Sequence, residues 1–106
     1  MVTIRIAKQK IKELVSDLHS AGYNPSRAVL FGSLAKQKAH DLSDIDVAIW
    51  DNKFIGCAPF DYESIVKILR RYPRLELHTF NSAETKETNP FIEEIEKDGI
   101  EIDIAS

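Results

Sequence analysis

The sequence predicts an α/β fold, in which a small mixed β-sheet is flanked by helices. Apolar residues recur at helical spacing near both ends of the chain, and short apolar or alternating runs that are typical of strands lie between them. A chain of 106 residues has the length of one compact domain with a modest core. We therefore expect residues 1–106 to form a single domain.

The first expected element is an amphipathic helix over residues 8–21, whose apolar side chains fall on one helical face. Gly22 follows it, at a position where glycine commonly ends a helix. After a turn, residues 28–31 form a continuous apolar run that predicts a short buried strand. Gly32 and Ser33 end this strand abruptly.

A short helix is expected over residues 34–39, followed by a polar stretch and a second strand over residues 44–50. Alternate residues of a strand point to opposite faces of the sheet. Asp44 and Asp46 therefore share one face, while Ile45 and its apolar neighbours occupy the other. Two carboxylates are thus expected side by side.

A loop over residues 51–59 precedes a helix expected over residues 61–71, which Pro73 terminates. Residues 74–80 alternate again and predict a third strand, in which Glu76 and His78 share one face.

A polar loop follows, and Pro90 marks the first residue of a short last helix. Gly99 lies just after the end of that helix, and residues 100–104 predict a closing edge strand.

Composition restricts the class of ligand and the compartment. A net charge of -3, without a long run of lysine or arginine, is not the pattern of a protein that grips long nucleic acid. The single Cys57 has no cysteine partner within the chain, and no apolar run resembles a signal peptide or approaches membrane-spanning length. These features predict a cytoplasmic protein without a membrane segment.

The turn at Gly32 and Ser33 is a candidate phosphate-binding site. A glycine allows close approach to the backbone, a following helix start offers unpaired N–H groups, and the serine adds a hydroxyl donor. On the next strand, Asp44 and Asp46 would repel each other unless a divalent cation lay between them, and Mg²⁺ prefers such oxygen ligands. This combination suits phosphoryl-group chemistry with two metal ions.

A two-metal site needs a third carboxylate, and Glu76 is the first candidate, because the alternation of its strand can place it beside the aspartates. Asp51 and Asp61 are the fallback choices. We interpret His78, on the same face as Glu76, as a half-buried hydrogen-bond partner rather than a metal ligand.

The motif of Gly32-Ser33, a ten-residue gap and Asp44-Ile45-Asp46 resembles the DNA polymerase β-like nucleotidyltransferase superfamily. The chain looks most like the minimal nucleotidyltransferases, which are small proteins often encoded beside a helical HEPN partner. The resemblance implies a nucleotidyltransferase (polymerase β-like palm) fold, with Asp44, Asp46 and Glu76 as metal ligands and catalytic residues.

It further implies ATP as substrate, Mg²⁺ as cofactor, and transfer of AMP to a hydroxyl of the partner in a toxin-antitoxin pair.

Two residues depart from the family pattern. Leu34 stands where many relatives have arginine after the glycine-serine pair, and Lys36 is the candidate to supply that positive charge instead. Glu76 is one methylene longer than the usual aspartate. The alternative function is therefore a catalytically degenerate binding module that neutralises its partner by occlusion.

Two further readings rank lower, a nucleotide or metal sensor and a polymerase acting on nucleic acid. The cluster Arg70, Arg71 and Arg74 is interpreted as a solvated helix end. Packing is the expected role of Tyr23, Tyr62 and Tyr72.

Overall fold

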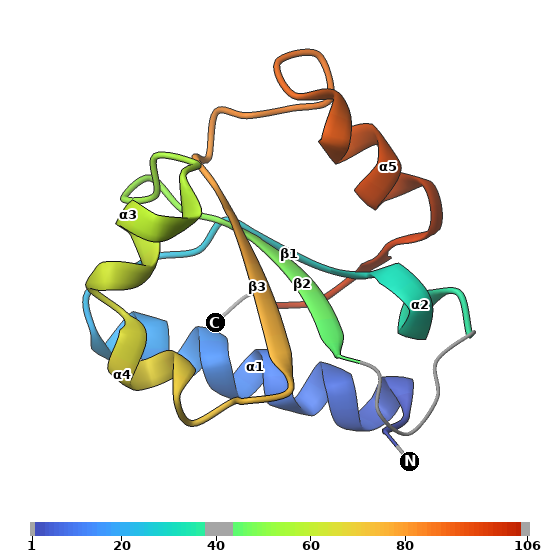
Figure 1. Ribbon diagram of the computed structural model, residues 1–106, viewed down its shortest axis with the longest axis horizontal. Coiled ribbons are helices and arrows are strands. Elements are labelled where there is room, and N and C mark those ends of the chain that lie inside the picture. The colour runs from blue at the N-terminus through green and yellow to red at the C-terminus, as the bar shows by residue number, and fades with distance from the viewer. Residues whose placement is uncertain (1, 38–43, 105–106) are drawn as a thin grey trace.

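A four-stranded mixed sheet lies between helices on its two faces (Figure 1). The computed structural model describes residues 2–37 and 44–104, to which all structural statements refer. Its elements follow one another as α1 (Ile4–Ser20), β1 (Arg27–Phe31), α2 (Gly32–Ala35), β2 (Ile45–Trp50), α3 (Ala58–Glu63), α4 (Val66–Leu69), β3 (Leu75–Phe80), α5 (Pro90–Asp98) and β4 (Ile100–Glu101). The predicted mixed α/β architecture is confirmed.

The strands lie in the order β3-β2-β1-β4. β1 runs antiparallel to both β2 and β4, whereas β2 and β3 are parallel. The last strand is at an edge of the sheet, as predicted, but it covers only Ile100–Glu101 because it pairs with β1 at two positions.

Helix α1 begins four residues earlier than its apolar pattern predicts, because the side chain of Thr3 caps it by accepting a hydrogen bond from the Ile6 backbone N–H at 3.1 Å. At its other end Gly22 has φ +94°, and the N–H of Tyr23 bonds back to the carbonyl of Leu18 at 2.9 Å. This left-handed termination is the Schellman motif, in which glycine avoids the strain that a Cβ would introduce.

The continuous helix expected over residues 61–71 is wrong. The chain instead forms α3 and α4, which are separated at Ser64 and Ile65. Asp61 explains why α3 starts early, since its buried carboxylate accepts hydrogen bonds from the N–H groups of Ile55, Gly56 and Cys57 just before the helix. The helix is therefore anchored at its first turn and breaks where Ile65 enters the core.

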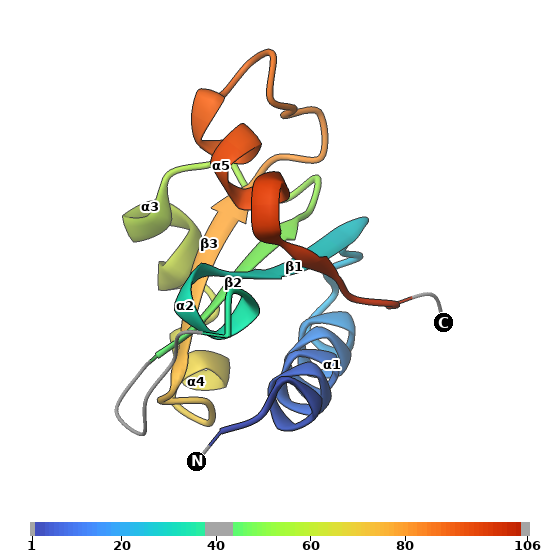
Figure 2. The same cartoon turned by 90° about the vertical axis from the view of Figure 1, so that its right-hand side faces the viewer.

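The sheet separates two apolar clusters. Toward α1, strand residues such as Val47 and Ile49 pack against Ile11 and Leu14 of that helix. The other face carries a smaller cluster formed by Val29, Ala48, Trp50, Phe80, Ile92 and Ile95. Figures 1 and 2 show α5 on the face opposite α1, so this second cluster lies beneath α5.

No helix in the described ranges is both long and apolar enough to cross a membrane.

Candidate active site

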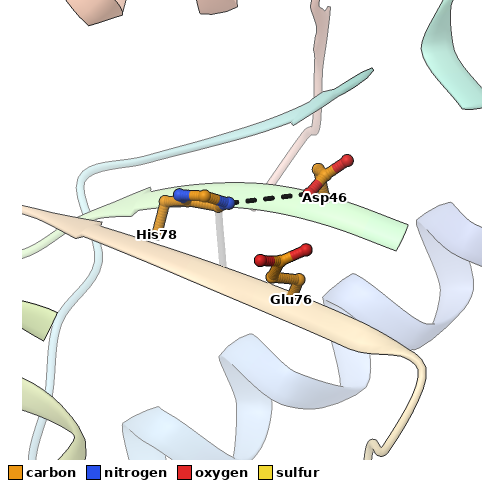
Figure 3. Close-up of side chains that lie close together, drawn as sticks. All are labelled: Asp46, Glu76 and His78. Carbon is orange, nitrogen blue, oxygen red and sulfur yellow. Dashed lines mark ion pairs between the residues drawn. The ribbon is translucent and has the colours of Figure 1, made fainter. Parts of the chain in front are cut away.

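Two neighbouring strands bring three ligand-bearing side chains together on the α5 face of the sheet. The parallel pairing of β2 and β3 aligns Asp46 with Glu76 and Ala48 with His78. One ligand atom from each of Asp46, Glu76 and His78 lies within 4.8 Å of the others. Figure 3 shows the two carboxylates and the imidazole converging from the two strands. The register therefore creates a cluster that could hold a metal ion.

Gly32 forms the wall of this cluster on the β1 side. β1 pairs Phe31 with Asp46, which places the next residue, Gly32, against the aspartate. A Cβ built on Gly32 would lie 2.2 Å from Asp46 Oδ2 and 3.0 Å from its Cγ. The backbone at Gly32 also has φ +78°, a left-handed conformation that favours glycine. Both observations explain why glycine ends β1.

Like charge and burial act together on Asp46. Burial raises the pKa of Asp46, the hydrogen bond and the negative charge of Glu76 raise that pKa further, and His78 lowers it. Two adjacent carboxylates that disfavour each other's ionised form are stabilised when a cation binds between them.

His78 does not have the hydrogen bond that we expected of it. Its Nε2 lies 3.6 Å from Oδ1 of Asp46, which is longer than a hydrogen bond. The nitrogen is buried and has no hydrogen-bond partner among the described residues. The interpretation of His78 as a satisfied hydrogen-bond partner is therefore wrong for this nitrogen.

Three rings gather beside the carboxylates. The ring of His78 lies 5.0 Å from Phe31 in an edge-to-face arrangement and 5.9 Å from Phe91 of α5. The two phenylalanine rings are 6.0 Å apart and nearly perpendicular. Phe91 remains 45% exposed. The sequence indicated that Phe91 packs the last helix, and only the fold reveals that its ring borders the site.

The remaining residues proposed from the sequence lie around this cluster. Asp44 is exposed and directly precedes β2, and it does not belong to the three-residue cluster formed within the described ranges. Ser33 is half-buried in the single turn of α2, and Lys36 is exposed at the end of that turn. The expected helix over residues 34–39 covers Gly32–Ala35 instead, and residues 38 and 39 lie outside the described ranges.

Leu34 packs into the core beside α1, where it is only 6% exposed. The position at which the resemblance implied arginine therefore serves the apolar core in this chain.

The fallback carboxylates have structural partners. The oxygens of Asp51 accept hydrogen bonds from the backbone N–H groups of Asn24 and Lys53. Asp61 accepts, besides the three loop N–H groups, the hydroxyl of Thr79 at 2.7 Å. Thr79 alternates with His78 and so faces the other side of β3. These aspartates hold loops in place, and Glu76 is the carboxylate that the fold puts beside Asp46.

The arginine cluster is not only a solvated helix end, because one of its members forms an ion pair within the chain. Arg71 pairs with Asp17 of α1 at 3.3 Å, and the hydroxyl of Tyr72 donates to the same carboxylate at 2.5 Å. Tyr23, Tyr62 and Tyr72 pack against the main core, as predicted.

The chain belongs to the family described as Polymerase beta, Nucleotidyltransferase, whose pattern matches residues 9–104. This match covers nearly the whole chain and includes every residue of the cluster. A comparison with curated proteins found no match. The family resemblance inferred from the glycine-serine turn and the aspartate pair is confirmed at the level of the nucleotidyltransferase domain.

The donor set fits a divalent cation of the kind that this family uses with nucleoside triphosphates. Asp46 and Glu76 supply adjacent carboxylate oxygens, which are the ligands that Mg²⁺ prefers. The absence of a side chain at Gly32 leaves free the space that the Asp46 carboxylate occupies. The arrangement supports nucleotidyl transfer, in which a hydroxyl attacks a phosphorus atom and pyrophosphate departs.

Proposed function

We propose that this protein transfers AMP from ATP to a hydroxyl of a partner protein, as an antitoxin paired with a helical protein of the HEPN type. The observation that carries the proposal is the register of β2 and β3, which places Asp46 beside Glu76 in a chain of the nucleotidyltransferase family.

The carboxylates bind the cation in this proposal, and one of them, Glu76, also acts as general base. Asp46 and Glu76 hold the cation, with Asp44 as a further ligand from the residue that precedes β2. When bound, Mg²⁺ supplies positive charge that favours ionisation of the attacking hydroxyl and departure of pyrophosphate. Glu76 is the more exposed of the two clustered carboxylates, and it accepts the proton of the acceptor hydroxyl as general base.

The bonds balance in a single displacement. The acceptor oxygen forms a bond to the α-phosphorus of ATP, and the bond between that phosphorus and the β-phosphate oxygen breaks. Pyrophosphate leaves with the bonding electrons, while the acceptor proton passes to Glu76 and then to solvent.

The residues on either side of the cluster orient the nucleotide. Gly32 and Ser33 hold phosphate oxygens through the backbone N–H groups at the start of α2 and the hydroxyl of Ser33, next to the Asp46 carboxylate that lies against Gly32. Lys36 offers its ammonium charge to the outer phosphates of ATP. On the opposite side the exposed ring of Phe91 offers an apolar face to the base, and stacking of this kind tolerates any base.

The test is a transfer assay with α-labelled ATP, Mg²⁺ and the product of a neighbouring HEPN-type gene. Wild type should label the partner, whereas Asp46→Asn and Glu76→Gln should lower the rate by at least about 100-fold. Asp98→Asn changes an exposed aspartate at the end of α5 in the same way and should retain full activity. Equal labelling by wild type and Asp46→Asn would refute the assignment.

One observation favours a second candidate, a binding module that neutralises the partner by occlusion. The burial of Leu34 removes from the phosphate side the charge that many relatives carry there. This candidate predicts that the Asp46→Asn protein forms a tight complex and still neutralises the partner, with no label transferred by either version. The enzyme proposal predicts that neutralisation fails in the variant.

A further inference from the structure

The buried Nε2 of His78 is the one polar side-chain nitrogen or oxygen in the described part of the chain that is both buried and without a hydrogen-bond partner. A buried polar atom in this state destabilises a fold by about 1–3 kcal/mol, so such atoms need an explanation. Figure 3 shows this nitrogen directed at Asp46, beside Glu76, and it lies 3.6 Å from Asp46 Oδ1, a distance that allows an ion pair only when the imidazole is protonated.

The rings around His78 explain why this nitrogen keeps its direction. Phe31 contacts the imidazole edge-to-face from β1, while Phe91 contacts it from α5. Aromatic contacts of this geometry restrict the orientation of a ring. The register adds a second restraint, since His78 lies two residues after Glu76 and alternates onto the same face. The imidazole is therefore held toward the carboxylates without a hydrogen bond to them.

We propose that His78 Nε2 is a ligand of the cation held by Asp46 and Glu76, and that it makes the site prefer Mn²⁺ to Mg²⁺. The inference rests on the proposed function for its premise that these carboxylates hold a divalent cation. The three ligand atoms lie within 4.8 Å of one another, so small side-chain rotations bring all of them onto one ion.

The preference follows from ligand chemistry. Mg²⁺ is hard, demands oxygen ligands in near-ideal octahedral geometry and loses its waters reluctantly. Imidazole is a good ligand for first-row transition metals, and carboxylates suit both classes of ion. A set of two carboxylates and one imidazole therefore gains more from Mn²⁺ than a set made only of carboxylates does. The nitrogen that has no hydrogen-bond partner in the described part of the chain would gain a ligand bond in the metal complex.

The experiment uses Mn²⁺ itself as the probe, without nucleotide or partner protein. Electron paramagnetic resonance measures free Mn²⁺ during a titration, and pulsed measurements detect coupling of the bound ion to a directly attached ¹⁴N nucleus. Mg²⁺ affinity follows from its competition with Mn²⁺. Wild type should show the ¹⁴N coupling and bind Mn²⁺ at least about tenfold more tightly than Mg²⁺.

His78→Phe removes the nitrogen but keeps an aromatic ring between Phe31 and Phe91. It should abolish the ¹⁴N coupling and weaken Mn²⁺ binding by about tenfold or more, while Mg²⁺ affinity changes much less. His19→Phe is the matched control, because this imidazole is exposed at the end of α1, outside the cluster. If His78→Phe does not fold, as judged by its thermal melting, His78→Gln provides the same comparison.

Bound Mn²⁺ without ¹⁴N coupling in wild type would overturn the inference, and so would a variant that keeps wild-type affinity for Mn²⁺. If Mg²⁺ still supported AMP transfer in that case, the proposed function would stand while the role of His78 fell. If wild type bound neither ion, the inference and its premise would both be refuted.

Discussion

Replacing Gly32 by alanine tests whether the position of the Asp46 carboxylate determines the activity. The new Cβ would lie 2.2 Å from Oδ2, whereas ordinary contact begins at 3.4 Å, so this oxygen must move by about 1 Å. Rotation of the carboxylate alone does not relieve the contact, because Cγ and Cβ of Asp46 would be only 3.0 and 3.2 Å from the added methyl group. The whole side chain of Asp46 must therefore be displaced from the position that it holds beside Gly32.

The magnitudes follow from this geometry. A misplacement of about 1 Å in a catalytic group can cost about 100-fold in rate, so AMP transfer by Gly32→Ala should fall by at least that factor. An L-residue with φ near +78° also loses roughly 1–2 kcal/mol in stability. For a domain of this size the melting temperature should fall by about 4–8 °C for each kcal/mol.

Gly22→Ala is the matched control. Gly22 has φ +94°, so the backbone strain is similar, but an added Cβ would meet only the flexible Lys53 ammonium at 3.2 Å. Gly22→Ala should lose comparable stability and keep both Mn²⁺ binding and AMP transfer. The reasoning is refuted if Gly32→Ala and Gly22→Ala transfer AMP at the same rate.

Three further predictions can be measured by melting curves and steady-state kinetics. Asp46→Asn should raise the melting temperature at neutral pH without metal. The pKa of Asp46 is raised in the folded protein, so wild type loses stability as the pH rises through that pKa, and asparagine avoids this loss. The difference between variant and wild type should therefore vanish below about pH 4, where the aspartate is protonated in both states. Added Mg²⁺ should stabilise wild type only, and a variant less stable than wild type in metal-free buffer would contradict the destabilisation of the Asp46 carboxylate by burial and by Glu76. Phe91→Ala should raise the KM for ATP about tenfold, with little change in kcat, because the base loses its stacking partner. The control Phe60→Ala, which truncates an exposed ring on α3, should leave KM unchanged. Equal KM values for the two variants would exclude stacking on Phe91. Asp61→Asn should lower the free energy of unfolding by about 3 kcal/mol, since a neutral amide poorly replaces a carboxylate that accepts three N–H groups and a hydroxyl, and an unchanged melting temperature would contradict that role.

The strand alternation was sufficient to predict which residues share a face. Period-two patterns in β2 and β3 correctly put Glu76 and His78 on one side of their strand, and the cluster uses that side. The helix boundaries were less predictable, because they depend on side chains from elsewhere. Asp61 in the first turn of α3 accepts hydrogen bonds from the loop before it, and the spacing of apolar residues does not predict such bonds.

In the candidate site, too, local sequence features were predictable, whereas contacts between distant residues were not. The glycine at the end of β1 and the acidic pair at the start of β2 are local features, and they were sufficient to identify a nucleotidyltransferase domain. The missing hydrogen bond at Nε2 of His78 could not be predicted from the sequence, because it depends on the surroundings of that nitrogen in the fold. Phe91 likewise borders the site only because α5 crosses the face of the sheet that carries the carboxylates.

The sequence by itself determined the strands, the face on which each strand residue lies and the class of chemistry, because backbone periodicity and residue type act locally. Only the tertiary structure decided that Asp46 lies opposite Glu76, that Gly32 lies against Asp46 and that Nε2 of His78 is directed at Asp46. Strand register and helix placement arise from packing of the whole core, in which residues distant in the sequence compete for the same space.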